Sequence, residues 1–229
     1  MSTILAIETS TELASVALLC DREIIVRESA GVQTHSQSVL PMVQTVLQEA
    51  GLRVQDCDAL AFGSGPGSFT GVRTACGITQ GLAFATNLPV VPVVTLQAMA
   101  QACLERYGKN DVVVLLDARM EEVYWARYRY DGAWRIVVEP ALASPQSVTS
   151  APTAAACGNG LDAYAAAFEQ HVFAERIADI PGPHAKHIAR LAQQAWSRGE
   201  TVQAKDAQPL YLRNKVALTT AERQAKLAV

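Results

Sequence analysis

One arrangement of strands occurs twice in the chain, and this duplication restricts the possible folds more than any other feature. Residues 3–30 read as three short strands joined by polar turns, and the first strand, TILAIE, has the apolar pattern of a strand buried on both faces. Residues 112–139 repeat the order of an apolar strand, an acidic residue, a second strand, a turn and a third strand. When the two segments are laid over each other, Glu8 falls opposite Asp117, which indicates two related halves.

A second pair of segments extends the repeat. ALAFGSGPGSF at residues 59–69 and AAACGNGLDAY at residues 154–164 each read as a small apolar strand that runs into Gly-x-Gly and then into a helix. We therefore predict an α/β protein with two sub-domains of a duplicated actin-like or ribonuclease H-like fold, β-β-β-α-β-α, in which the second copy is degenerate. Residues 1–100 are expected to form the N-terminal sub-domain with the interface helices, and residues 101–229 the C-terminal sub-domain.

The spacing of apolar residues predicts helices between these strands. A helix at 34–51 is expected to be capped by Ser36 or Ser38 and to end at Gly51. Further helices are predicted at 69–86, 95–108 and 183–199, and a strand at 88–94. Residues 208–229 are expected to form a strand or loop and then a short helix, with a solvated basic tail that holds Arg213, Lys215, Arg223 and Lys226.

The composition argues against several classes of protein. The net charge of −3 and the missing basic stripe argue against a chain that grips nucleic acid on its own. No apolar run approaches the roughly 20 residues of a membrane-spanning helix, and the start MSTILAIETS lacks the pattern of a signal peptide. Five scattered cysteines fit buried thiols in a reducing compartment. We therefore expect a cytoplasmic protein.

The glycine-rich stretch GSGPGSFTGVR at residues 63–73 fails the familiar phosphate-binding patterns. It contains no GxxxxGK[ST] and no lysine, and the last glycine of GxGxxG would fall on Ser68. A helix that begins at Ser68 offers an N-terminus that attracts anions. A tight strand-to-helix turn capped by Ser68 is the alternative, and the missing charged groups favour it.

The turn after the first strand has the same two interpretations, a phosphate-binding turn or a purely structural one. A duplicated meander with an acidic residue at the first turn of each half is the arrangement of the actin-like ATPases and sugar kinases, where an aspartate holds magnesium or activates a nucleophile. Here Glu8 takes that place and no glycine follows, so side chains block the close approach of a phosphate. Glu8, Thr9, Ser10 and Arg73 are the residues expected nearest to any nucleotide. Otherwise the first three cap the end of the strand.

The histidines predict no metal site. His35 and His171 stand alone in the sequence. His184 and His187 have helical i, i+3 spacing, but no nearby carboxylate completes a ligand set. We expect both at a solvated helix start.

The predicted helix at 69–86 holds glycines at 71, 77 and 81. Each glycine inside a helix costs about 1 kcal/mol relative to alanine, and such helices commonly gain a close approach to another helix. The expected neighbour is the helix at 36–50, from the same chain or from another one.

Several motifs together resemble a known family. ILAIETST, HSQSVLP, GSGPGSFTGVRTACGITQGLA, LLDARMEEVYWA and PLYLR are similar to the TsaB family of bacterial tRNA threonylcarbamoyladenosine biosynthesis proteins, and GPGSFTGVR is the most specific of them. The resemblance covers nearly the whole chain. It implies a protein without chemistry of its own that assists TsaD, which transfers a threonylcarbamoyl group from threonylcarbamoyl-AMP to N6 of the adenosine beside the anticodon in tRNAs that read codons starting with A.

The resemblance also implies partners and an interface. TsaB forms a homodimer or pairs with TsaD through the two helices at 36–50 and 69–86, and the ATPase TsaE joins the complex, so tRNA is contacted only indirectly. TsaD holds a metal through a His-x-x-x-His pair, and the matching positions here are Thr95 and Met99, which implies that no metal is bound. No intrinsic cofactor is implied, and ATP or ADP is expected only at the interface of the complex. The implied interface consists of Val39, Val43, Val46, Leu47, Gly71, Val72, Ala75, Ile78 and Leu82.

Two other readings stay open. An independent actin-like ATPase or kinase would need Glu8 or Asp117 to manage magnesium and both glycine turns to hold phosphate. A metallopeptidase of the glycoprotease type would need bound zinc or iron.

Overall fold

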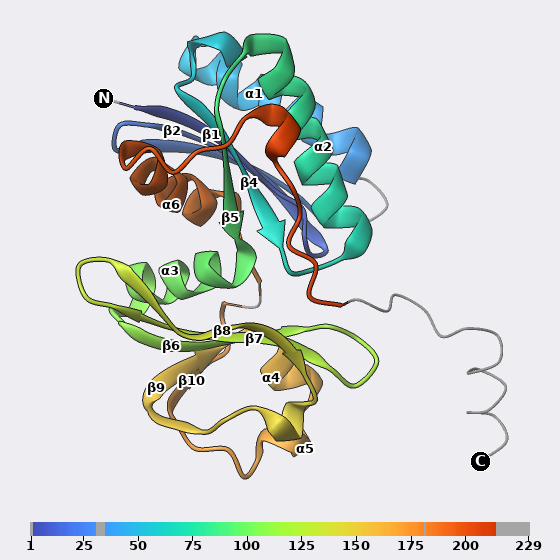
Figure 1. The fold of residues 1–229 in the computed structure, drawn as a ribbon, viewed down its shortest axis with the longest axis vertical. Helices are drawn as coiled ribbons and strands as arrows, with labels where there is room; N and C mark the ends of the chain where they lie inside the picture. The colour runs from blue at the N-terminus through green and yellow to red at the C-terminus, as the bar shows by residue number, and fades with distance from the viewer. Residues whose placement is uncertain (1, 31–34, 181, 214–229) are drawn as a thin grey trace, which may run out of the picture.

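The computed structural model describes residues 2–30, 35–180 and 182–213 (Figure 1). The first half holds strands β1 (Thr3–Glu8), β2 (Leu13–Cys20), β3 (Glu23–Ala30), β4 (Ala59–Gly65) and β5 (Val90–Val94), with helices α1 (His35–Ala50) and α2 (Phe69–Thr86). The second half holds strands β6 (Asp111–Asp117), β7 (Val123–Tyr130), β8 (Trp134–Ala143), β9 (Ala151–Cys157) and β10 (Phe173–Ile177), with the short helices α4 (Gly160–Ala163) and α5 (Ala165–Phe168). Helices α3 (Thr95–Tyr107) and α6 (Ala185–Ser197) lie where the halves meet.

The two sheets share one topology. The first runs β3-β2-β1-β4-β5 and the second, read from its other edge, runs β8-β7-β6-β9-β10. In each sheet a meander of three antiparallel strands is extended by two parallel strands. Glu8 ends β1 and Asp117 ends β6, as the sequence repeat required. The predicted α/β fold with a duplicated unit is therefore confirmed.

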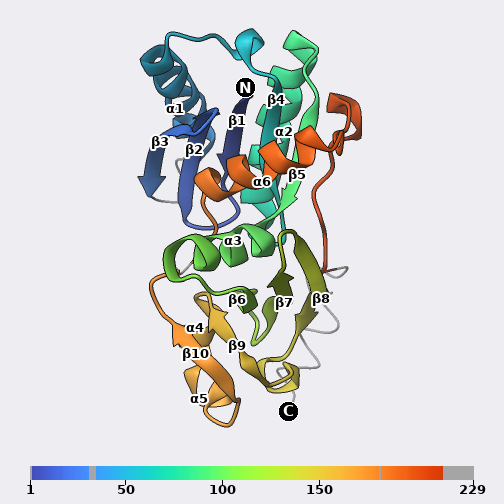
Figure 2. The ribbon, with the colours of Figure 1, turned by 90° about the vertical axis from the view of Figure 1, so that its left-hand side faces the viewer.

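The halves are stacked in layers (Figures 1 and 2). Helices α1 and α2 cover one face of the first sheet, and α6 lies across its other face, as Figure 2 shows. Helix α3 covers the near face of the second sheet and packs against α6, while α4 and α5 lie on the far face. Buried aliphatic side chains fill each of these contacts, so that both sheets are covered on both faces.

Helix α6 follows the strands of the second half in the sequence, but it packs against the sheet of the first half. Its buried residues Ile188, Ala189 and Ala192 pack against Ile4 and the rest of the first sheet. The sequence division assigned this helix to the C-terminal sub-domain. The packing places it on the N-terminal sheet, because its strongly apolar stripe covers a sheet face that would otherwise be exposed. The division near residue 100 itself stays a prediction.

The helix ends also differ in part from the expectations. Ser68 caps α2, and its side chain accepts a hydrogen bond from the Gly71 amide. Neither Ser36 nor Ser38 caps α1, because the chain is already helical at His35, so that prediction was wrong. Residues 208–213 form a loop, and the helix expected after them, with Lys215, Arg223 and Lys226, lies outside the described residues. None of the described helices has the length and hydropathy of a bilayer-spanning segment.

Candidate functional site: the cleft between the halves and the outer face of α2

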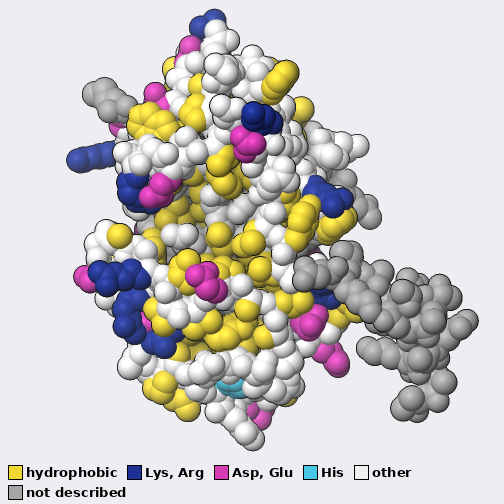
Figure 3. All heavy atoms as spheres, viewed as in Figure 1, with side chains coloured by type: hydrophobic (Ala, Val, Ile, Leu, Met, Phe, Trp, Pro, Cys, Tyr) yellow, Lys and Arg dark blue, Asp and Glu magenta, His cyan; other side chains and the backbone are white. Residues whose placement is uncertain are grey.

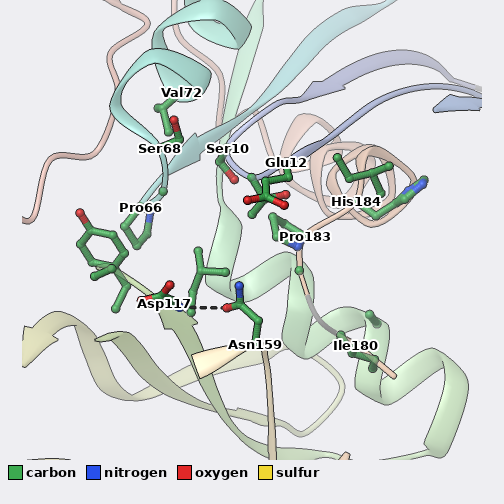
Figure 4. A pocket seen from close by; sticks show the side chains of 18 of the residues that line it. Ser10, Glu12, Pro66, Ser68, Val72, Asp117, Asn159, Ile180, Pro183 and His184 are labelled. Atoms are coloured by element: carbon green, nitrogen blue, oxygen red, sulfur yellow. Dashed lines mark hydrogen bonds between the residues drawn. The ribbon is translucent and has the colours of Figure 1, made fainter. Parts of the chain in front are cut away.

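A cleft of about 1110 Å³ separates the two halves. Its walls include the turn 10–13 after β1, the start of α2, the end of β6, and residues from 179–180, 182–187 and 210–213. Figure 4 shows Ser10, Glu12 and Ser68 on one side, with Asp117 and Asn159 facing them from the other. Hydrophobic side chains gather near the middle of the face seen in Figure 3, where the halves meet. A concave, largely apolar site with a few convergent polar groups is the usual form of a ligand site.

The glycine-rich loop is packed against the turn after β1. A Cβ at Gly63 would overlap the Glu8 carboxylate, and a Cβ at Gly71 would overlap the Thr9 carbonyl. At Gly67 a Cβ would lie 2.6 Å from both the Cβ and the carbonyl oxygen of Ser10. Three glycines of the loop therefore accommodate three successive residues of the same chain. This explains the glycine content without a phosphate.

Glu8 lies buried beneath the cleft. Its Oε1 accepts a hydrogen bond of 2.5 Å from the Ser10 amide, while its Oε2 has no hydrogen-bond partner among the described residues. Burial raises the pKa of the Glu8 carboxyl to about 7, against the lowering effect of the Ser10 hydrogen bonds. The carboxyl is therefore held largely away from water, which does not suit a magnesium ligand facing the cleft.

Four backbone amides at the turns beside the cleft, two in each half, have partners within the chain. In the first half, Ser10 N donates to Glu8, and Ser68 N donates to the Ser10 carbonyl at 2.7 Å. In the second half, Asp117 N donates to Asn159 Oδ1 at 2.9 Å, the dashed contact in Figure 4, and Arg119 N donates to Asp117 Oδ1 at 2.7 Å. Phosphate-binding turns need free amides. Both turns use these amides to hold themselves together.

Asp117 lies at the centre of the second wall. It also accepts from the Tyr164 hydroxyl at 2.8 Å and lies 3.4 Å from the Arg119 guanidinium. Arg119 spans the cleft to Glu12, again at 3.4 Å. The backbone at residues 119–121 has φ near +60°, a left-handed conformation that is uncommon outside glycine. An arginine therefore bridges the two acidic turns.

His184 and His187 lie at the start of α6, as predicted, but their side chains are largely buried and not solvated. His184 caps α6, and its Nε2 lies 2.7 Å from Glu28. The Nδ1 of buried His187 lies 3.2 Å from Glu105 on α3. Burial lowers the pKa of His184, although the contact with Glu28 acts to raise it. Burial acts to raise the pKa of Glu105, but hydrogen bonds from His187 and Gln101 outweigh it, so that this pKa is lowered. Carboxylates from other elements, which local spacing does not reveal, pair with both rings.

Thr95 and Met99 do not supply metal ligands. The Thr95 hydroxyl donates to the Pro66 carbonyl at 2.6 Å, and Met99 is buried in the core of the second half. The two side chains fill the space beside Gly63 and Gly158, the matching glycines of the two halves. The described residues contain no cluster of three His, Cys, Asp or Glu side chains suited to a metal. These donors do not fit the metal that the family resemblance implies for TsaD.

Most of the residues that the sequence predicted for the interface are buried in the hydrophobic core of this chain. Val39, Val43, Val46, Leu47, Gly71, Val72 and Ala75 are buried, and Ile78 and Leu82 are partly buried against the same core. The outer face of α2 presents other residues instead: Gly77 and Gly81 with open space around them, and Phe84, which is 85% exposed. The interface stays a prediction.

Arg73 lies on the outside of α2; within the described part of the chain it pairs with no acidic group, and it is not one of the residues that line the cleft. Its guanidinium stacks 3.7 Å from the centre of the Phe69 ring, and its Nε donates to the Tyr211 hydroxyl at 2.7 Å. Of the four residues expected near a nucleotide, only Ser10 lines the cleft. Glu8 and Thr9 are buried behind it.

Sequence reasoning missed Asn159, Tyr164 and Tyr211, and it was wrong to place Arg213 in a solvated tail, because Arg213 is largely buried and pairs with Glu122. The repeat itself carried a signal for one of them, because aligning GSG with GNG sets Asn159 opposite Ser64 beside the second acidic turn. Tyr211 and Arg213 belong to a segment with no regular structure, and no periodic pattern predicts its path.

Comparisons with known proteins agree with the resemblance seen in the sequence. A family model described as TsaD, tRNA N6-adenosine threonylcarbamoyltransferase, matches residues 24–221. The tRNA threonylcarbamoyladenosine biosynthesis protein TsaB of Haemophilus influenzae is 40% identical, over 93% of this chain and 94% of its own length. TsaB of Escherichia coli is 38% identical, over 93% and 96%.

Solved structures support the same assignment. YeaZ from Pseudomonas aeruginosa superposes with a TM-score of 0.85 at 41% identity, over 93% of this chain and all of its own. A second structure, described as similar to peptidase YEAZ from Pseudomonas aeruginosa, has a TM-score of 0.86 at 40% identity, with the same coverage. Sequence and structure therefore agree along nearly the whole chain. The chain belongs to the TsaB family of tRNA threonylcarbamoyladenosine biosynthesis proteins.

Proposed function

We propose that the chain is a non-catalytic partner of TsaD. Together with TsaE, it supports the transfer of the threonylcarbamoyl group from threonylcarbamoyl-AMP to N6 of the adenosine beside the anticodon, in tRNAs that read codons starting with A. The observation that carries the proposal is the outer face of α2. It has a single charge, Arg73, open space at two glycines and an 85% exposed phenylalanine.

The chemistry of the cleft supports a role without catalysis. Two amides at each acidic turn donate to groups of the same chain, and Arg119 bridges Glu12 and Asp117. Thr95 and Met99 lack the imidazoles of a metal site. The chain accordingly needs no metal or nucleotide of its own, and ATP or ADP binds only where the subunits of the complex meet. The tRNA is held mainly by the partner.

Exposure of α2 also supports a homodimer when TsaD is absent. Gly77 and Gly81 let another helix approach closely, and Phe84 and Leu40 supply apolar area on the neighbouring helices. The same face cannot serve both contacts at once, so TsaD displaces the second copy.

Size-exclusion chromatography with TsaD tests the interface. Gly77→Arg and Phe84→Asp change only side chains that point into open space, and both variants are expected to fold but to lose co-elution with TsaD. Ile136→Asp is the matched control, because Ile136 is an exposed apolar residue of the second half, on β8. Normal co-elution of both α2 variants would contradict the proposed face.

An assay of threonylcarbamoyl transfer tests the role. TsaD and TsaE are supplied with tRNA, with and without this chain, and transfer is expected to depend on it and to fail with Phe84→Asp. Transfer at the full rate without the chain would overturn the proposal. ATP hydrolysis by the chain alone, lost in Glu8→Ala, would support the rival reading as an independent ATPase.

A further inference from the structure

We propose that the C-terminal strap, Ala207–Arg213, is a clasp that couples the outer face of α2 to the cleft between the halves. The coupling rests on the proposed function in one respect, namely that TsaD binds the outer face of α2. The clasp itself rests on contacts within the chain.

The strap is anchored first to the first half. Ala207 is completely buried, and its carbonyl accepts from Gln80 Nε2 at 2.9 Å and from Cys76 Sγ at 3.6 Å, both on α2. Leu210 N then donates to the Ser64 carbonyl at 2.7 Å. The strap therefore follows α2 and reaches the glycine-rich loop.

A few residues later the strap is anchored to the second half. Leu212 packs against the core of the second sheet. Arg213, whose side chain is 15% exposed, donates to the Ala118 carbonyl at 2.9 Å and pairs with Glu122 at 2.7 Å. These contacts hold the left-handed turn 119–121, which also carries Arg119 and its contact with Glu12.

The short connection leaves the cleft little freedom at this rim. Three residues in extended conformation span about 10 Å at most. The Cα atoms of Leu210 and Arg213 therefore cannot move further apart than this, and only the length of the Arg213 side chain adds to the reach of the second anchor. Wider opening of the cleft requires one of the two anchors to detach.

Tyr211 links the clasp to the face of α2. It lies between the two anchors, its ring centre is 6.0 Å from that of Phe69, and its hydroxyl accepts from Arg73. Phe69 and Tyr211 are both nearly half exposed, 42% and 46%. A partner that contacts Phe69 and Arg73 competes with Tyr211 for them. Binding at α2 thus loosens the strap and favours an open cleft, and an open cleft in turn favours the partner by the same factor.

Hydrogen exchange of the full chain tests the clasp. Tyr211→Phe removes only the hydroxyl that accepts from Arg73, and Arg73→Ala removes the donor. Within the described residues, neither side chain forms a hydrogen bond, ion pair or ring contact with the turn 118–122. We expect amide exchange in that turn to rise about threefold in both variants, as loss of one surface hydrogen bond implies. Arg213→Ala is expected to raise exchange at the Leu210 amide in return.

The control and the partner complete the test. Arg198→Ala removes an exposed arginine that pairs with Glu200, away from the strap, and should leave exchange in 118–122 unchanged. Unchanged exchange in 118–122 for both Tyr211→Phe and Arg73→Ala overturns the clasp. Addition of TsaD should raise exchange in 118–122, and binding without that rise overturns the coupling. Failure of TsaD to bind at all counts against the proposed function, while the variants still decide the clasp.

Discussion

The two halves of the molecule share one sheet topology but differ in what covers their outer faces. The first half carries α1 of 16 residues and α2 of 18 residues, whereas the second carries α4 and α5 of four residues each. Both sheets are still covered, because side chains such as Phe168 and Val148 fill the space in the second half. Only the first half therefore has long helices with an outer face free for a partner.

The acidic turns differ in a related way. In the first half the turn is fixed by the glycine-rich loop, which fits around Glu8, Thr9 and Ser10. In the second half the turn is fixed by side chains, Asn159 from inside and Arg213 from the strap. The two halves thus share the backbone arrangement of the acidic turn but stabilise it with different contacts.

The largest expected effect is on the glycine packing of the first half. Gly71→Ala would force a methyl group into the Thr9 carbonyl, and we expect the free energy of unfolding to fall by about 3–4 kcal/mol. Urea denaturation measures the loss. An unchanged midpoint would mean that the turn and the loop are not held together as described.

A pH series on Glu8 tests the buried carboxyl. The folded pKa of about 7 lies above the ordinary value of 4.5, so the folded protein binds an extra proton between these values. The contribution of the protonated Glu8 carboxyl to the free energy of unfolding is therefore fully present below pH 4.5 and is lost as the pH rises through 7. Glu8→Gln should abolish this loss, which corresponds to about 3 kcal/mol at roughly 1.4 kcal/mol per pKa unit. Parallel curves for both proteins would show that Glu8 ionises freely.

Asp111 in the second half should respond in the opposite direction. Hydrogen bonds from Arg127 and then Arg129 outweigh burial and lower its pKa below 3.8. Its contribution is present above that value and is lost as the pH falls through the folded pKa. Asp111→Asn should lower the free energy of unfolding at neutral pH by about 1–2 kcal/mol, with little difference at strongly acid pH. Denaturation at two pH values decides this, and an equal loss at both would contradict it.

The smallest effect is a gain in stability on the open face of α2. Gly77→Ala adds a methyl group where nothing lies within 4 Å, so the isolated chain should gain about 1 kcal/mol from helix propensity. Thermal unfolding measures this gain. A loss of stability would mean that the Gly77 position is already in contact with another part of the chain.

Regular elements could be predicted from the sequence because local patterns determine them. The repeat gave the order of strands, and Ser68 marked the start of α2 through its own capping chemistry. The candidate site depends on contacts between distant segments. His187 and Glu105 are paired across two helices, and Arg73 meets Tyr211 from a segment without periodic structure.

The predicted interface residues also show how far local sequence patterns can predict contacts. Val39 and Val46 were chosen as apolar residues on a helix, and apolar residues on a covering helix face their own sheet first. The exposed face of α2 carries instead residues that break the amphipathic pattern, Gly77, Gly81 and Phe84, and these are the centre of the interface that we propose. The outward face of α2 is therefore recognised from the residues that depart from the amphipathic pattern, and not from the apolar residues that follow it.

The return of α6 to the first sheet has a consequence for synthesis on the ribosome. Roughly 90 residues separate β5 from α6, so at about 5–20 residues per second the first sheet emerges several seconds before the helix that covers its second face. During that interval Ile4, Ala6 and Leu19 stay uncovered in the nascent chain. The first half therefore completes its folding only after α6 has been synthesised, and a fragment that stops at residue 100 would be prone to aggregate.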